Sequence, residues 1–248
     1  MSHKEQTQKH IFSFFCPNII EPSWSSGSII WLQSQDLVHR LVKVVKVEKD
    51  DEFVLFDKQH NVFIKVLSVL KKEIQARVIS FQDNISLQPK ITYLLPILKK
   101  EALEQAVYSL TEIGVSEIRL VITAKSRQSL MSEKEYQRLG GIVIAAAEQS
   151  KNYNFSELFE PEKLSEILTD CLQSVKIVFD ASGESFFEVK KDVKSDQTIL
   201  LLVGPEGGLL VEELSFLKAQ SFKTCALTQT TLRAVQAVAV SAALFRLS

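Results

Sequence analysis

A repeated alternation of apolar runs and helical patterns after residue 90 constrains the fold of this chain more than any other feature. The apolar runs are short, and those nearest the C-terminus are continuous, which is typical of strands buried on both faces of a sheet. Strands are predicted at 91–96, 117–123, 175–180, 198–203 and 223–227. Helices are predicted at 98–113, 133–149, 161–172, 211–219 and 232–247. This alternation predicts an α/β fold, in which helices cover both faces of a parallel sheet.

The first 80 residues have a different pattern. Runs of β-branched and aromatic residues predict strands at 10–16, 28–32, 41–49, 52–57, 61–70 and 74–80, with a short helix at 36–41. Several short strands within so few residues predict a small β-barrel. The polar stretch SFQDNISLQPK at 80–90 is typical of a linker, so the predicted domains are 1–80 and 81–248.

Composition narrows the class of protein. The chain has 248 residues, 46% of them apolar and 24% charged, as in ordinary globular proteins. No apolar run reaches the roughly 20 residues that a transmembrane helix needs. The N-terminal residues MSHKEQTQKH also lack the apolar core of a signal peptide, so a cytoplasmic protein without a membrane partner is expected. The three cysteines and four histidines lack metal-ligand spacing, so no metal site is expected.

Three of the eight glycines lie in one segment, GPEGG at 204–208. It follows a predicted strand and precedes a predicted helix, and α/β proteins bind ligands at the carboxyl ends of their strands. Glycine allows a positive φ and a close approach of a ligand to the backbone. The acids in and after the segment, and the missing lysine of a phosphate loop, argue against a phosphate ligand. Two interpretations stay open: a loop that touches a neutral or cationic ligand, and a tight turn that needs glycine for its own geometry.

A second segment, ALTQTTLRAVQAVAVSAALF at 226–245, contains a polar turn and then a helix of small apolar residues. Such a helix is expected to be buried. Arg233 lies at its N-terminus, where the helix dipole disfavours a cation. Burial beside an acid or a ligand carboxylate would explain this placement, and a solvent-exposed arginine is the alternative.

The two segments together resemble the 16S ribosomal RNA uridine-N3 methyltransferases of the SPOUT superfamily. The similarity rests on LLLVGPEGG with the acids after it, followed downstream by L-x4-LR at 227–233. LEQAVYSLTEIGVSEI at 103–118 and IAAAEQS at 144–150 are similar to helical segments of the family, and residues 36–57 resemble its N-terminal barrel. The resemblance implies a trefoil-knotted parallel-sheet methyltransferase domain preceded by a small PUA-like β-barrel that binds RNA. It further implies a homodimer that uses S-adenosylmethionine to methylate N3 of a specific uridine in 16S rRNA or the small ribosomal subunit.

The same resemblance implies roles for individual residues. Arg233 would stabilise charge in the reaction or hold the cofactor, and no residue is assigned as the general base. The residues expected to bind RNA are Arg40, Lys43, Lys46 and Gln149, and for the first three a solvated strand edge is the alternative. The residues expected to bind the cofactor are Leu202, Gly204, Pro205, Glu206, Gly207, Gly208, Leu227, Thr228, Leu232 and Arg233. The helices at 98–113 and 232–247 are candidates either for the dimer interface or for ordinary core.

The chain departs from the family pattern at polar positions. Ala234, Val235 and Gln236 stand where the family has Thr-Glu-Thr, and Ser13 stands where it has an arginine before two phenylalanines. Lys151 and Asn152 follow the AAEQS segment where the family has an arginine. Two functions therefore compete: an active methyltransferase that has diverged, and an RNA-binding relative with impaired catalysis.

Overall fold

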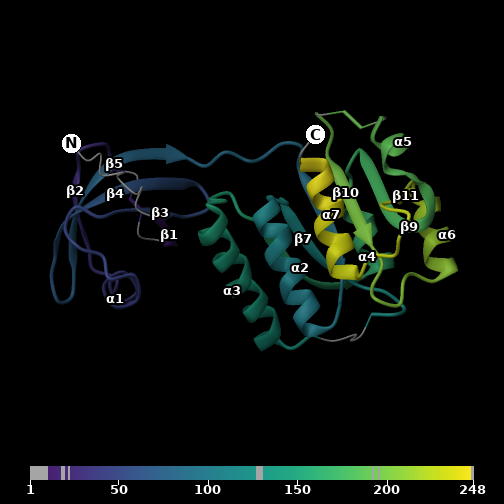
Figure 1. Cartoon of the computed structure of the whole chain (residues 1–248), viewed down its shortest axis with the longest axis horizontal. Helices are drawn as coiled ribbons and strands as arrows, with labels where there is room; N and C mark the ends of the chain where they lie inside the picture. The colour runs from purple at the N-terminus through teal and green to yellow at the C-terminus, as the bar shows by residue number, and fades with distance from the viewer. Residues whose placement is uncertain are drawn as a thin grey trace, which may run out of the picture. The chain divides into compact units, whose positions relative to one another are not determined.

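The computed structural model describes residues 11–17, 20–21, 23–126, 131–191, 193–194 and 196–246. The chain divides into two compact units, Met1–Ile85 and Ser86–Ser248 (Figure 1). Each unit contains its own sheet. Of the helices within these ranges, none has both the length and the apolar character that a membrane span requires.

The first unit is built on a five-stranded sheet with the order β1-β3-β4-β5-β2. β1 and β3 are parallel, and the other neighbours are antiparallel. β1 and β2 are the edges of this sheet, and no pairing between them closes a barrel within the described residues. The strands are β1 (Phe12–Phe15), β2 (Ile29–Leu32), β3 (Glu52–Phe56), β4 (His60–Val69) and β5 (Ile74–Asp83).

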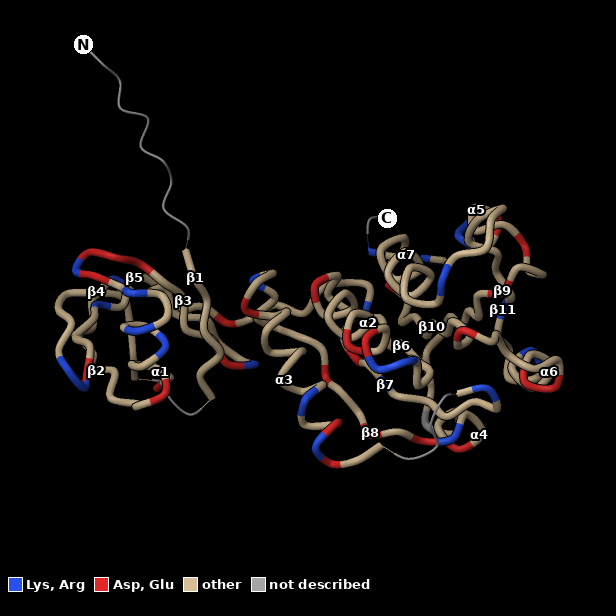
Figure 2. Tube along the Cα trace, turned by 60° about the horizontal axis from the view of Figure 1, so that its bottom comes forward, with Lys and Arg blue, Asp and Glu red and all other residues tan. Residues whose placement is uncertain are grey.

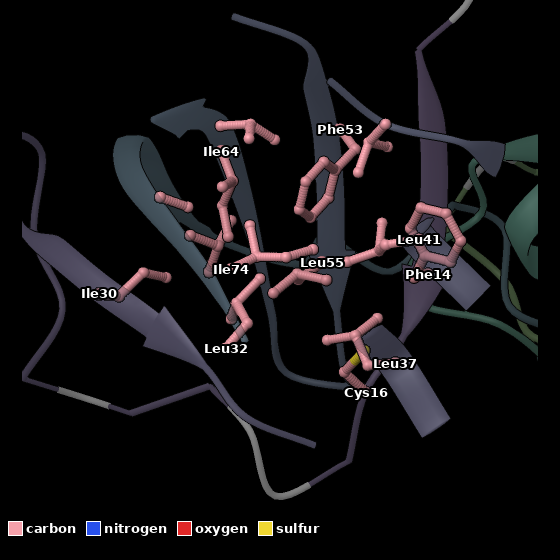
Figure 3. Close-up of a cluster of buried hydrophobic side chains, with 14 of the residues drawn as sticks. Phe14, Cys16, Ile30, Leu32, Leu37, Leu41, Phe53, Leu55, Ile64 and Ile74 are labelled. Atoms are coloured by element: carbon pink, nitrogen blue, oxygen red, sulfur yellow. The ribbon is translucent and has the colours of Figure 1, made fainter. Parts of the chain in front are cut away.

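One face of this sheet carries the core of the unit. Phe14, Phe53 and Ile64 come from three neighbouring strands, and all are buried. Leu37 and Leu41 cover them from the helical segment between β2 and β3 (Figure 3). The core forms on this face because alternate residues of a strand point to opposite sides of a sheet.

The predicted strand at 41–49 is wrong. α1 (Gln35–His39) is followed directly by a π-helical turn, η1 (Arg40–Val45), which ends at Lys46 with a left-handed φ of 59°. Leu37 and Leu41 lie one helical turn apart, and both are buried in the core. Tertiary packing of this pair therefore overrides the β-propensity of the valines that follow.

The second unit has a six-stranded sheet with the order β11-β9-β10-β6-β7-β8, and every pairing in it is parallel. The five predicted strands and the parallel sheet are confirmed. Sequence reasoning missed β8 and the extension of β9 beyond residue 180. The strands are β6 (Ile91–Pro96), β7 (Glu117–Ile122), β8 (Glu157–Lys163), β9 (Val175–Ser185), β10 (Ile199–Val203) and β11 (Lys223–Ala226).

Helices cover both faces of the sheet, as expected. Leu217 of α6 and Ile167 of α4 pack on Leu200 and Leu202 of β10, whereas α2 and α7 lie side by side on the opposite face (Figure 1). The helices are α2 (Lys100–Ile113), α3 (Glu133–Ser150), α4 (Leu164–Ile167), α5 (Phe186–Lys191), α6 (Val211–Ala219) and α7 (Ala234–Arg246), and the 3-10 turn η2 (Leu168–Asp170) follows α4.

One predicted helix is largely wrong. Pro161, expected in the first turn of a helix at 161–172, lies in β8 at the edge of the sheet, and only a short helical segment follows it. An edge strand tolerates proline because one side of the strand needs no N–H donor. The predicted helix at 232–247 begins at Ala234, and its expected end at Leu247 lies outside the described residues.

Candidate functional site

A cavity of about 900 Å³ opens at the carboxyl ends of the central strands of the second unit. Four segments line it: 99–105 after β6, 179–181 in β9, 203–209 after β10 and 227–237 after β11. The connection after β6 leads to β7 on one side, and that after β10 leads to β11 on the other. Ligands of α/β proteins bind where connections from neighbouring strands diverge in this way.

The glycine segment forms a tight turn beside this cavity. The N–H of Gly208 donates a hydrogen bond of 2.8 Å to the carbonyl oxygen of Pro205, and Gly208 has a φ of +70°. A Cβ on Gly204 would lie 3.1 Å from the backbone nitrogen of Leu209. The geometry of the turn itself therefore favours glycine at 204 and 208. Gly204, Pro205, Glu206, Gly207 and Gly208 all line the cavity.

The acids around the turn hold backbone groups in place. Oε1 of Glu206 accepts a hydrogen bond of 3.0 Å from the N–H of Lys99, just before α2. Glu213, in the first turn of α6, accepts one of 2.8 Å from the N–H of Leu210 and another of 2.8 Å from the N–H of Ala124. These two carboxylates fix the glycine turn between the loops that follow β6 and β7.

Lys125 completes this arrangement, and sequence reasoning missed it. Its Nζ donates a hydrogen bond of 2.8 Å to the carbonyl oxygen of Gly207. A Cβ on Gly207 would meet the Cδ of Lys125 at 3.1 Å, so the space beside this glycine is filled by the lysine side chain. The only signal in the sequence is that Lys125 follows a predicted strand.

The second segment lies across the cavity from the glycine turn. Leu227, Thr228, Leu232 and Arg233 all line the cavity, so the structure brings the two predicted segments together. The Thr228 hydroxyl donates a hydrogen bond to the carbonyl oxygen of Thr230, which shapes the turn before α7. Both segments therefore contribute to one site.

Arg233 is exposed and precedes the first residue of α7. No hydrogen bond or ion pair to its guanidinium exists among the residues that the structure describes. The side chain is exposed and is not buried beside an acid of the described residues, while a ligand carboxylate as its partner stays a prediction. Its charge is consequently available at the rim of the cavity.

Leu202 is placed differently from the other predicted cofactor residues. It is fully buried between the sheet and the helices α4 and α6, and it does not line the cavity.

The three positions at 234–236 that depart from the family pattern differ in their relation to the cavity. Ala234 and Val235 line the cavity, whereas Gln236 is exposed and lies outside it, in a shallow groove between α2 and α7.

Several polar residues of the cavity were not predicted. Asp180 lies where β9 passes the cavity, and its Oδ1 accepts hydrogen bonds from the N–H (2.9 Å) and hydroxyl (2.6 Å) of Ser182. An acid that ends an apolar run was the only available signal for it. The others are Lys99, Glu101, Gln105, Thr230 and Thr231. Within the described part of the chain, no cluster of acidic, histidine and cysteine side chains is suited to a metal ion.

The predicted RNA-binding residues occupy helical segments. In the first unit, the Arg40 guanidinium lies 5.1 Å from the centre of the Phe14 ring, and Lys43 and Lys46 are exposed. Since these residues belong to a helical turn and its C-cap, the strand edge considered for them does not exist. In the second unit, Gln149 is exposed near the C-terminus of α3.

Comparisons with known proteins agree with this arrangement. The chain is 29% identical to ribosomal RNA small subunit methyltransferase E of Aquifex aeolicus over 221 residues, which cover 86% of this chain and 91% of the relative. It is 25% identical to the protein of the same name from Synechocystis, over 91% of this chain and 75% of the relative.

Two solved structures with the same fold contain a bound cofactor. Ribosomal RNA small subunit methyltransferase E of Neisseria gonorrhoeae, bound to S-adenosyl methionine, has a TM-score of 0.81 at 23% identity, over 96% of this chain and 98% of that one. A methyltransferase from Legionella pneumophila in complex with SAM has a TM-score of 0.81 at 21% identity and the same coverage. The family model of the RNA methyltransferase domain matches residues 86–246, which include all four cavity-lining segments and most of the chain, and the chain belongs to this family.

Proposed function

We propose that this protein methylates N3 of a specific uridine in 16S rRNA, with S-adenosylmethionine as the methyl donor. The observation that carries the proposal is the meeting of the glycine turn and the 227–233 segment at one cavity, at the carboxyl ends of parallel strands. The two relatives described above are named as small-subunit rRNA methyltransferases. An rRNA substrate would place the reaction in the cytoplasm.

The cavity suits S-adenosylmethionine in size and chemistry. Its volume of about 900 Å³ is that of a pocket for a nucleoside-sized ligand. Leu209, Leu227 and Leu232 offer apolar surface for a purine ring, while Asp180 and Glu101 offer negative charge for a cationic ligand. When bound, the cofactor supplies an electrophilic methyl group carried on a sulfonium.

The residues of the chain would then act mainly by positioning. The glycine turn and the residues Leu227, Thr228 and Leu232 hold the ligand, so that the acceptor atom can be placed in line with the methyl group. The methyl group would leave the sulfur of the donor as its bond to N3 forms, and the N3 proton would pass to water. The exposed guanidinium of Arg233 would stabilise the negative charge that develops on uracil in this step. Because N3 lies on the Watson–Crick edge, the target base has to be unpaired when it enters the cavity.

The finer architecture belongs to the same proposal. We expect the two cavity-lining loops to form the trefoil knot of the SPOUT superfamily, and the first unit to be a PUA-like RNA-binding module. Arg40, Lys43, Lys46 and Gln149 would contact the RNA backbone, which fixes register without reading sequence. A shallow groove between α2 and α7, lined by Tyr108, Val235, Gln236 and Ala239, supports this face as a homodimer interface.

An RNA-binding relative with impaired catalysis is the second candidate, because Ala234, Val235 and Gln236 replace three polar residues of the family pattern. Expression of this chain in bacteria that lack their own N3 uridine methyltransferase separates the two functions. Recovery of N3-methyluridine in 16S rRNA supports the enzyme. RNA binding without the modified nucleoside supports the relative. Calorimetry that detects no binding of S-adenosylmethionine to the wild-type protein excludes the first proposal.

A further inference from the structure

The outer face of the first unit's sheet carries an exposed tryptophan. Ile30 and Leu32 of β2 point into the core, whereas Ile29 and Trp31 point away from it and are 55% and 46% exposed. Large apolar side chains that gather on a solvent-facing surface are typical of interaction sites. Trp31 lies on the face of the sheet opposite the core, whereas Leu37 and Leu41, from the helical segment that carries Arg40, Lys43 and Lys46, pack into the core.

Strand register places a cation beside this tryptophan. Gln75 of β5 lies opposite Trp31, and Arg77 lies opposite Ile29. Because diagonal neighbours on one face of a sheet are within reach of long side chains, Arg77 can approach whatever covers Trp31. We refer to Ile29, Trp31, Gln75 and Arg77 as the Trp31 surface.

The charges around this surface favour an anionic partner. Lys65 of β4 lies opposite Arg77 on the other side of β5, and directly opposed like charges destabilise a sheet. Two acids lie on the Lys65 side, since Asp50 pairs with Lys65 at 3.1 Å and Glu52 lies opposite Lys65 on β3. A third acid, Glu73, lies beside β2 and accepts a hydrogen bond from the side chain of Gln33. The described residues provide no ion pair for Arg77.

The turn between β4 and β5 extends the positive charge. Lys71 and Lys72 are exposed in this turn, and the only acid beside them, Glu73, accepts a hydrogen bond of 2.9 Å from the side chain of Gln33. Figure 2 shows lysine and arginine segments close to β2 in this unit. An aromatic ring flanked by cations is the usual arrangement of sites for single-stranded nucleic acid, because bases stack on the ring and phosphates contact the cations.

We infer that the Trp31 surface binds single-stranded RNA, with an unpaired base stacked on Trp31 and phosphates contacted by Arg77, Lys71 and Lys72. The inference rests on the proposed function for the presence of an RNA substrate. The Trp31 surface lies outside the methyl-transfer cavity, so it would bind nucleotides that flank the target uridine rather than the uridine itself.

Tryptophan fluorescence tests the inference directly. The chain has only two tryptophans, and Trp24 packs against the core, so a Trp24→Phe background leaves Trp31 as the only emitter. Full-length protein in this background is titrated with a single-stranded oligouridylate of twelve nucleotides and with a duplex RNA of equal length. We expect the single strand to quench Trp31 emission and the duplex to quench it little.

Affinity measurements on variants complete the test. Trp31→Ala should weaken binding of the fluorescently labelled single strand about tenfold, and Trp31→Phe should retain much of the affinity. Arg77→Ala should reduce the slope of log affinity against log salt concentration by about one, which corresponds to the loss of one phosphate contact. Phe187→Ala, which removes another aromatic ring that is 78% exposed, is the matched control and should change nothing.

Three outcomes overturn the inference: RNA that binds without quenching Trp31, an unchanged affinity of Trp31→Ala, and no binding of the single strand. If the Trp31 surface docked another protein instead, Trp31→Ala would leave the affinity for RNA unchanged, which is the second of these outcomes. Quenching does not require catalysis. If quenching occurs while no N3-methyluridine forms in cells, the proposed function fails and the Trp31 surface stands.

Discussion

Lys125 donates a hydrogen bond of 2.8 Å from its Nζ to the carbonyl oxygen of Gly207, and so joins the loop after β7 to the glycine turn after β10. The preceding residue, Ala124, donates its N–H to Glu213 in the first turn of α6, which follows the glycine turn. Two consecutive residues of one loop therefore hold the end of the glycine turn and the start of the helix after it. The shape of the cavity wall depends on a loop that does not line the cavity.

We expect Lys125→Met to weaken binding of S-adenosylmethionine by roughly fivefold, because a loss of about 1 kcal/mol is typical for one hydrogen bond at an exposed site. Isothermal titration calorimetry measures the effect. Lys125→Arg should restore part of the affinity, and Lys134→Met, at an exposed position of α3, should leave it unchanged. Equal affinities in Lys125→Met and the wild type would show that the turn keeps its shape without this contact.

Gly208 and Gly141 form a matched pair for testing the turn. A Cβ at either position meets no atom within 4 Å, but Gly208 has a φ of +70° whereas Gly141 lies inside α3. Gly208→Ala should destabilise the protein by about 1 kcal/mol, since a left-handed conformation is strained for alanine. Gly141→Ala should stabilise it by roughly 0.5–1 kcal/mol, because alanine favours a helix interior. Opposite shifts of the thermal unfolding midpoint are expected, and shifts of the same sign contradict this account.

Arg246 closes the second unit near its C-terminal end. Its half-buried guanidinium donates hydrogen bonds to the carbonyl oxygens of Pro89, before β6, and Gly114, at the C-cap of α2. Burial lowers the pKa of this guanidinium from its ordinary value, and the side chain still remains charged at neutral pH. Arg246→Met keeps the apolar stem but leaves both carbonyl groups without a donor, so we expect a loss of about 2 kcal/mol in the free energy of unfolding.

Urea denaturation measures this loss, and Arg138→Met is the control. Arg138 donates hydrogen bonds to both carboxylate oxygens of Glu104, but its own side chain is exposed, so its loss should cost less than that of the half-buried Arg246. A loss in Arg138→Met as large as that in Arg246→Met would contradict the structural role of the C-terminal contact.

The cysteines should be unreactive in the folded protein. All three are buried, and burial, with a smaller effect from the charge of Glu184, raises the pKa of the Cys225 thiol to about 11. A raised pKa means that the neutral thiol is favoured by folding, so its contribution to stability is full below the ordinary pKa and is lost as pH rises through the folded value. At pH 9.5, dithionitrobenzoate should therefore label no cysteine in the folded state and three in denaturant. Cys225→Ser should lower the number of cysteines labelled in denaturant from three to two. Rapid labelling of the folded wild type would contradict the expectation that all three thiols are unreactive.

Much of the second unit could be predicted from its sequence, because strands buried on both faces are continuous apolar runs. The failures share one physical cause. Pro161 lies in a strand because β8 forms hydrogen bonds with the edge of β7, and this edge exists only once the sheet has formed. Leu41 is helical because Leu37 and the core beneath it need a second apolar residue one turn away. Neither cause is visible in local propensity.

The residues of the candidate site also divide into those that local sequence predicts and those that depend on the tertiary structure. The glycine turn and the 227–233 segment could be predicted, since each has an unusual local composition. Lys125, Asp180 and Lys99 could not, because their approach to the cavity depends on the strand order β9-β10-β6-β7. Glu206 was predicted as a cofactor-binding residue, and no signal in the sequence indicated that its carboxylate also accepts a hydrogen bond from the backbone of Lys99.

Four segments between residues 99 and 237 line the cavity, and the last of them ends inside α7. A ribosome that synthesises this chain releases these segments one after another, and α7 emerges after every strand of the sheet. A nascent chain that has not yet received α7 lacks one wall of the cavity and would have no complete place for a cofactor. Competence to bind the methyl donor would consequently arise only after α7 has been synthesised and has packed onto the sheet.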